Sequence, residues 1–195
     1  MSFVERIAEL NTGRLDGLHP FILDGAALGW LAEASAARLA AYKGVFKFDQ
    51  HGLQLDDRLL PANLGERSDA VAPVLADLAR RGYLSGWRNE LFPIVARLGH
   101  PPSLLVERAA VAMFGARGFG VHINGFVRTD DGIAMWVAKR ADDKPTWPGL
   151  LDQIVAGGQP AGLGVRENVT KECWEEAGID AALASLEAAA GDTGA

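Results

Sequence analysis

Apolar residues in the first half of the chain recur at steps of three and four, the spacing of one face of a helix. Residues 26–42 carry such a stripe through Leu28, Leu31 and Leu39, and this pattern predicts an amphipathic helix. Residues 103–114 predict a further helix. Both segments are therefore expected to bury one apolar face.

A third helix and a short hairpin are predicted between these two segments. Residues 45–48 and 53–55 flank the turn-like sequence Asp-Gln-His-Gly, which is typical of a β-hairpin. Ser68 and Asp69 resemble a helix cap, and Gly82 is expected to end the helix that follows. The buried stripe of this helix is predicted to consist of Val71, Val74, Leu75 and Leu78.

The pattern changes near residue 115, where Gly-Ala-Arg-Gly-Phe-Gly breaks the helical spacing. Residues 121–127 and 133–139 predict two strands, joined by the turn sequence Thr-Asp-Asp-Gly into a hairpin. A short strand is expected at 152–155, and helical spacing returns over 165–177, with Gly178 as its stop. These changes predict two domains, an α+β domain over residues 1–117 and the beginning of an α/β domain over residues 118–195.

Composition narrows the functional classes. The formal net charge is −6 without a run of Lys and Arg, which argues against binding to nucleic acid or to an acidic membrane surface. No apolar stretch approaches the length of a membrane helix, and the first ten residues contain acids where a leader peptide has a basic region. The single cysteine, Cys173, excludes an internal disulfide. We expect a cytoplasmic protein. Because the chain is acidic overall, an anionic substrate is expected to bind through a local positive group such as a metal ion.

Three acids in the predicted helix 165–177 carry the clearest chemistry. Glu172, Glu175 and Glu176 stand at i, i+3 and i+4, on one helical face. Like charges at this spacing repel unless a cation lies among them or the face is well solvated. Mg²⁺ suits such ligands because it prefers hard oxygens and keeps waters while it bridges to phosphates. A solvated surface is the alternative. The opposite face, expected to pack on a sheet, consists of Val165, Val169, Cys173 and Ala177.

The residues around this helix resemble a known signature. Gly157, followed by Lys-Glu-Cys-Trp-Glu-Glu-Ala-Gly-Ile from Lys171, is similar to the motif of the Nudix hydrolases, a glycine, a spaced glutamate and then Arg-Glu-apolar-x-Glu-Glu-x-Gly-apolar. The resemblance implies an α/β/α sandwich with a mixed sheet, and metal ligands at Gly157, Glu172, Glu175 and Glu176. It implies Mg²⁺ as cofactor, with Mn²⁺ as a substitute, and Glu172 and Glu175 as catalytic residues that hold the metal while activated water attacks phosphorus.

Two positions depart from this signature. Lys171 stands where the family has arginine, and Leu163 stands where it has its first glutamate. In the family these two residues are regarded as an ion pair that stabilises the loop, so both changes point to an altered loop. Glu167, one helical turn before Lys171, is expected to replace the missing acid.

A narrower resemblance concerns the substrate. Residues 107–127 and 144–158 look like the subgroup whose Nudix domain follows a domain of uncharacterised type, with fungal members related to thiamine pyrophosphokinase. This implies thiamine diphosphate, or its oxidised forms, as the substrate that is cut to the monophosphate. Arg140, Lys144 and Trp147 are the candidate substrate contacts, the cations for phosphate and the indole for stacking on a heteroaromatic ring. Packing is the alternative role for the indole.

The carboxyl-terminal end of the sequence leaves other readings open. Only 16 residues follow Ile179 and they resemble no strand, so we expect a sandwich that is truncated or completed by a second subunit in a homodimer. A noncatalytic module that binds a ligand or a partner is the alternative function. Diphosphate isomerisation on the same scaffold is a third, for which Cys173 is the only thiol.

Overall fold

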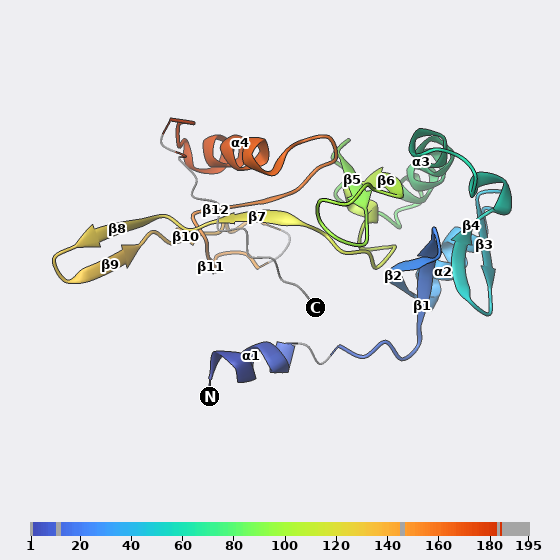
Figure 1. Ribbon diagram of the computed structural model, residues 1–195, viewed down its shortest axis with the longest axis horizontal. Coiled ribbons are helices and arrows are strands. Elements are labelled where there is room, and N and C mark those ends of the chain that lie inside the picture. The colour runs from blue at the N-terminus through green and yellow to red at the C-terminus, as the bar shows by residue number, and fades with distance from the viewer. Residues whose placement is uncertain (1, 11–12, 145–146, 183, 185–195) are drawn as a thin grey trace. The chain divides into compact units, whose positions relative to one another are not determined.

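The computed structural model describes residues 2–10, 13–144, 147–182 and 184 of the chain. It divides into two compact units, Met1–Arg117 and Gly118–Ala195, each with a hydrophobic core of its own (Figure 1). The residues near the carboxyl terminus on which the expected truncation rests lie outside the described part, as do residues 145 and 146 of the predicted substrate loop. No helix among the described residues is long and apolar enough to cross a membrane.

The first unit contains a mixed four-stranded sheet in the order β2-β1-β4-β3. Strand β1 (Leu18–Leu23) pairs antiparallel with β2 (Ala26–Ala32) and parallel with β4 (Gly52–Leu55). The predicted hairpin at 45–55 is confirmed, because β3 (Phe46–Asp49) pairs antiparallel with β4.

The helix predicted over residues 26–42 is wrong in its first half. Residues Ala26–Ala32 form β2, and only Glu33–Ala40 forms a helix, α2. Asp24 and Gly25 both have positive φ, the conformation of a tight hairpin turn, so the chain reverses directly into β2. The backbone of β2 is also held from outside the sheet, because Trp30 N–H donates to the Gly115 carbonyl at 3.1 Å. Pairing with the preceding strand β1 and with the backbone of Gly115 overrides the helical spacing.

Helix α3 (Leu64–Arg80) begins before the predicted cap. Asn63 and Glu66 form a reciprocal capping box, whereas Ser68 donates to the Leu64 carbonyl and accepts from Leu105 N–H. The predicted stop is confirmed, since Gly82 has a φ of 77° just after the helix. The predicted stripe is also confirmed, and all four of its members are buried: Val71, Val74, Leu75 and Leu78.

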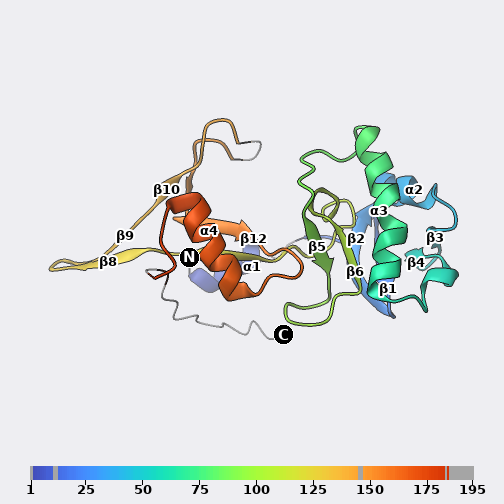
Figure 2. The same cartoon turned by 90° about the horizontal axis from the view of Figure 1, so that it is seen from above.

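The helix predicted over residues 103–114 is wrong. Leu104–Glu107 forms strand β6, which pairs antiparallel with β5 (Leu91–Ile94), and a single 3-10 turn follows at Arg108–Ala110. Strand β6 packs against α3, which runs beside β5 and β6 in Figure 2. A continuous apolar run fits either structure, and the hydrogen bonds of β5 decide for the strand.

The remaining elements of the first unit are a helix at its amino terminus and a short 3-10 turn. Helix α1 (Phe3–Leu10) exposes most of its apolar side chains, and a 3-10 turn spans Asp57–Leu59. Arg67 joins several segments: its buried guanidinium donates to both carboxylate oxygens of Asp24, at 2.9 and 3.0 Å, and to the carbonyls of Leu59 and Ser103. This side chain links the β1–β2 turn to α3 and to the start of β6.

The second unit consists of three strand pairs and one described helix. The predicted hairpin is confirmed as β8 (Phe126–Thr129) and β9 (Gly132–Met135), and its exposed apolar residues cover both faces. The predicted strand 121–127 is divided, since β7 (Gly120–Ile123) ends before β8. The predicted strands 133–139 and 152–155 are likewise divided, and the structure places the remaining strands at Ala138–Lys139 (β10), Leu151–Asp152 (β11) and Val155–Gly158 (β12).

Helix α4 (Val165–Ala177) has the predicted bounds and ends at Gly178, whose φ is 62°. It packs on the antiparallel pair β7–β12 (Figures 1 and 2). Its predicted packing face is right at Val169 and Cys173 but wrong at its two ends, which are exposed, while Asn168 is buried instead. Because α4 is the one helix described in this unit, a mixed α/β fold is what the structure shows, and α/β/α layering stays a prediction.

Candidate active site

The centre of the candidate site is the contact between β12 and α4. Gly157 in β12 pairs with Val121 of β7, and Glu172 of α4 lies directly against it. A Cβ atom on Gly157 would stand 2.1 Å from Glu172 Cδ and 2.4 Å from Glu172 Oε2. The side chain of Glu172 is only 12% exposed. Glycine is therefore required at 157 for the carboxylate of Glu172 to reach the strand.

The three predicted acids have different partners. Glu175 is 54% exposed and accepts a hydrogen bond of 2.8 Å from Lys171 Nζ, which also lies 3.1 Å from Glu172 Oε1. Glu176 Oε2 accepts from the backbone N–H of Ala156 at 3.0 Å. Within the described residues, no group of three or more His, Cys, Asp or Glu side chains converges as a metal site.

Lys171 holds the position between Glu172 and Glu175 that a cation would occupy. Its hydrogen bond to Glu175 raises the pKa of the ammonium group above its ordinary value, and Glu172 adds to this effect. Glu167, the predicted partner of Lys171, instead accepts from the N–H of Gly164 at 2.9 Å and caps its own helix. The predicted pairing of Glu167 with Lys171 is wrong, because the first turn of a helix has unpaired backbone N–H groups and the carboxylate of Glu167 accepts from one of them.

A cavity of about 330 Å³ lies beside the acids of α4. Its charged lining consists of three cations, Lys139, Arg140 and Lys144, and three anions, Asp152, Glu175 and Glu176. The structure thus brings two of the predicted substrate contacts together with two of the predicted metal ligands. Because the three cations and three anions balance, a diphosphate would enter this cavity more favourably with an added cation.

Arg140, one of the predicted substrate contacts, is held by hydrogen bonds to Asp152 and to Trp147. Its guanidinium donates to Asp152 at 2.6 Å and to the carbonyl of Trp147 at 3.2 Å. The bond from Arg140 lowers the pKa of the Asp152 carboxyl below its ordinary value. Lys144 is exposed at the cavity wall. The indole of Trp147 is 71% exposed and does not line the cavity, although the carbonyl of this residue orients Arg140.

Several contributing residues were not predicted from the sequence. Asp152 and Gln153 line the cavity, and Gln153 forms a hydrogen bond with the imidazole ring of His122 in β7. Gln159 and Asn168 are buried beside the glycine pair. A polar residue in the middle of an apolar helical face, as at Asn168, was the available signal. Cys173 lies in the core with Val121, Val155 and Val169, and burial raises the pKa of its thiol, which disfavours the isomerase alternative.

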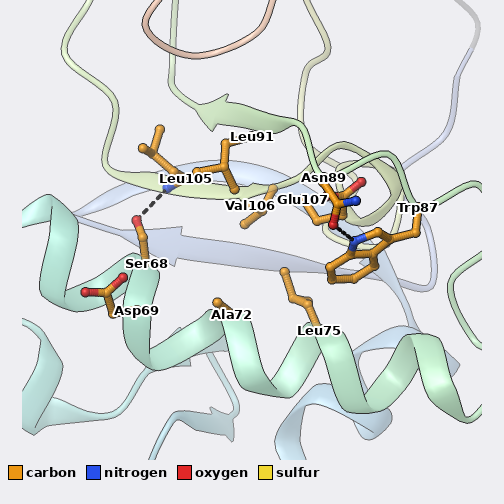
Figure 3. A pocket seen from close by; sticks show the side chains of 10 residues that line it. All are labelled: Ser68, Asp69, Ala72, Leu75, Trp87, Asn89, Leu91, Leu105, Val106 and Glu107. Atoms are coloured by element: carbon orange, nitrogen blue, oxygen red, sulfur yellow. Dashed lines mark hydrogen bonds between the residues drawn. The ribbon is translucent and has the colours of Figure 1, made fainter.

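The first unit has a separate cavity of about 220 Å³ between α3 and β6 (Figure 3). Its walls are mainly apolar, and Trp87 stands at one end, where its indole N–H donates to Asn89 at 2.8 Å. Glu107 is buried at its edge and is satisfied by the backbone N–H groups of Arg88 and Glu90. This cavity contains none of the residues predicted to act on substrate.

The donor set of the second unit is suited to a hard cation with few protein ligands. Glu172 and Glu175 already share one cationic group, and the side chain of Glu172 occupies the space that a Cβ at Gly157 would fill. Mg²⁺ is commonly held by one or two carboxylates together with water and substrate phosphate. Two carboxylates fit this requirement, whereas Glu176 is engaged with the backbone of β12. A divalent cation would have to displace Lys171.

Comparison with known proteins shows the family of the chain. Residues 2–118 match the family model described as Domain of unknown function (DUF4743). The chain belongs to this family. It is also 37% identical over 97% of its length to Nudix hydrolase 24, chloroplastic, of Arabidopsis thaliana, and 37% identical over 97% of its length to Nudix hydrolase 20, chloroplastic, of the same plant. The predicted resemblance to Nudix hydrolases that carry a further amino-terminal domain is confirmed.

The alignments also limit what this DUF4743 protein shares with its relatives. It spans about half of each plant protein, 52% and 53% of their lengths. An uncharacterized protein of Saccharomyces cerevisiae is 38% identical over 55% of this chain and is itself covered over 33%. The plant relatives are named chloroplastic, which describes those proteins.

Proposed function

We propose that this protein is a Mg²⁺-dependent Nudix hydrolase that cuts an organic diphosphate to the monophosphate. The proposed substrate is thiamine diphosphate or an oxidised analogue of it. One observation carries the proposal: a single cavity is lined by the cations Lys139, Arg140 and Lys144 and by the helix acids Glu175 and Glu176. Cations of this kind bind phosphate oxygens, and carboxylates hold the metal that phosphate chemistry requires.

The protein's own groups have distinct roles in this proposal. Glu172 and Glu175 hold the metal, with Gly157 leaving room for Glu172 and contributing its carbonyl. Arg140, fixed by Asp152, and Lys144 bind and orient the phosphates, and the exposed indole of Trp147, which lies outside the cavity lining, is proposed to stack on the heteroaromatic ring. Glu176 anchors the helix to Ala156. When bound, Mg²⁺, or Mn²⁺ in its place, lowers the pKa of a water molecule and neutralises charge on the leaving phosphate.

The proposal is tested by product analysis on the purified chain. Thiamine diphosphate, its oxidised analogue and ADP-ribose are supplied separately, with and without Mg²⁺, to the wild type and to Glu175→Gln. We expect Mg²⁺-dependent formation of a monophosphate that the substitution lowers by about 10²-fold or more. Glu9→Gln, an exposed change in the first unit, is the control and is expected to keep full activity. A product that forms equally in Glu175→Gln would contradict the assignment.

A noncatalytic binding module is the second candidate function. The position of Lys171 between Glu172 and Glu175 favours it, because an internal cation satisfies these acids without a metal. Binding of thiamine diphosphate by calorimetry without turnover, in this chain and in a chain extended to the length of the plant relatives, would support this candidate and exclude hydrolysis. A cytoplasmic location and a homodimer stay predictions.

A further inference from the structure

The turn between β12 and α4 is closed from inside by a glutamine. Gln159 is 5% exposed, and its side-chain amide donates to the Leu163 carbonyl at 2.6 Å and to the Pro160 carbonyl at 3.5 Å. Its backbone N–H donates to the Phe119 carbonyl at 2.8 Å, which continues the β7–β12 ladder by one residue. A single residue therefore fixes both the start of the turn and its end.

Asn168 connects this turn to helix α4. The side chain is fully buried, and its amide nitrogen donates to the Gly158 carbonyl at 2.9 Å and to Gln159 Oε1 at 3.1 Å. The Asn168 side-chain oxygen is a buried atom without a hydrogen-bond partner among the described residues. An unsatisfied buried oxygen costs stability, and a polar side chain kept at such a cost points to a role beyond packing.

The two amides act at the place where Glu172 is positioned. Asn168 and Glu172 stand one helical turn apart on the same face of α4. Asn168 is bonded to Gly158, and Glu172 lies against the adjacent residue Gly157. The hydrogen bond of Asn168 therefore sets the distance and the register between α4 and β12. Those quantities decide where the carboxylate of Glu172 lies.

We propose that Gln159 and Asn168 form a neutral amide clasp that positions Glu172 and the carbonyls of the glycine pair. Gln159 reaches the carbonyl of Leu163, the position at which the chain lacks the acid of the Nudix pattern. Lys171, the other departing position, forms its ion pairs with Glu172 and Glu175. The turn is thus held by uncharged hydrogen bonds, which are insensitive to salt screening and to pH because side-chain amides do not titrate in water.

The inference rests on the proposed function where it concerns the metal. The test therefore measures the position of Glu172 and the binding of the metal separately. The variants are Asn168→Asp, which replaces the donor to Gly158 by an acceptor of the same size, and Gln159→Glu, which removes the donor to Leu163. Asn124→Asp is the control, the same change at an exposed position of the same unit. Mn²⁺ binding is measured by electron paramagnetic resonance, the Gly157–Glu172 contact by nuclear Overhauser effects, and unfolding by circular dichroism.

We expect Asn168→Asp to weaken Mn²⁺ binding by about tenfold or more and to lower kcat with little change in KM, since loss of an outer-shell partner typically has this effect. Gln159→Glu is expected to act in the same direction, and Asn124→Asp to stay within about twofold of the wild type. Gln159→Glu provides the test if Asn168→Asp does not fold. Unchanged Mn²⁺ affinity in folded variants with a lowered Tm would overturn the proposal, since the amides would then be structural only.

A wild type that binds no Mn²⁺ would reject the proposed function and leave the positioning claim to be decided by the Overhauser effects. Loss of the Gly157–Glu172 contact in Asn168→Asp, with the contact kept in Asn124→Asp, would then support the clasp. The same contact in both variants would overturn it.

Discussion

Replacement of Gly157 by alanine is the sharpest perturbation of the candidate site. The added methyl group would stand 2.1 to 2.4 Å from Cδ, Cγ and Oε2 of Glu172. Nonbonded carbon atoms are at their optimum separation near 3.5 to 4.0 Å, so the carboxylate must retreat by roughly 1 Å or more. Gly157 does not have a positive φ, so alanine suits the backbone itself.

The expected effect on activity is much larger than the effect on stability. Misplacement of a reacting group by about 1 Å costs on the order of 10²-fold in rate. The clash involves the far end of a side chain that can rotate, and alanine in a strand is favoured over glycine by roughly 0.5–1 kcal/mol. We therefore expect kcat for monophosphate release to fall about 10²-fold while the free energy of unfolding changes by less than about 1 kcal/mol.

The assay compares Gly157→Ala with Gly118→Ala, because a Cβ at Gly118 would meet no heavy atom within 4 Å. Turnover with Mg²⁺, Mn²⁺ affinity and urea unfolding are measured for both. Equal Mn²⁺ affinity and equal turnover in the two variants would refute the reasoning, because Glu172 could then act from a displaced position. A large loss of stability in Gly157→Ala alone would instead show that the contact is a packing contact.

The remaining predictions concern stability, cation binding and thiol reactivity. Arg67→Met should lower the free energy of unfolding in urea by about 2 kcal/mol, because it removes the buried guanidinium that bonds to Asp24 and to the carbonyls of Leu59, Leu60 and Ser103; a loss below about 0.5 kcal/mol would show that these bonds are dispensable. Arg67 lowers the pKa of Asp24 below its ordinary value of 3.8. The Asp24–Arg67 pair therefore stabilises the fold above that pH, and this stabilisation is lost as the pH falls through the lowered pKa. Asp24→Asn should flatten the acid side of the curve of Tm against pH, and an unchanged curve would count against this prediction. Lys171→Gln should cost roughly 0.3–0.5 kcal/mol without metal and regain it with Mn²⁺, whereas a deficit that Mn²⁺ leaves intact would argue against a shared cation position. Cys173 should react with iodoacetamide only after unfolding, as followed by mass spectrometry, and rapid labelling of the folded chain would contradict its burial.

The sequence predicted an element correctly where the residues that decide its structure all lie within one short segment. The helix Val165–Ala177 has its predicted bounds because its spacing and its glycine stop lie in the same stretch. The hairpin of β3 and β4 follows from a short turn sequence for the same reason. The helix predicted for 26–32 was wrong because the hydrogen-bond partners of this segment lie outside it, in the preceding strand β1 and at the backbone of Gly115.

The candidate site divides in the same way. Gly157 and the three glutamates were recognised by their order in the sequence, which resembles the Nudix signature. Their different surroundings were not predictable from that order. The spacing on α4 indicated three equivalent acids, whereas contacts with β12 make Glu172 enclosed, Glu176 bonded to the strand and Glu175 open to the cavity.

The sequence by itself determined the family, the acids on one helical face, the absence of a disulfide and the elements whose signals are local. Only the tertiary structure decided that β2 and β6 are strands, that Lys171 pairs with Glu172 and Glu175 and not with Glu167, and that Asn168 is buried against Gly158. The physical reason is that helical spacing and turns are set by residues within a few positions of one another. Strand pairing, burial and the partner of a charged side chain depend on segments that the fold brings together from far apart in the chain.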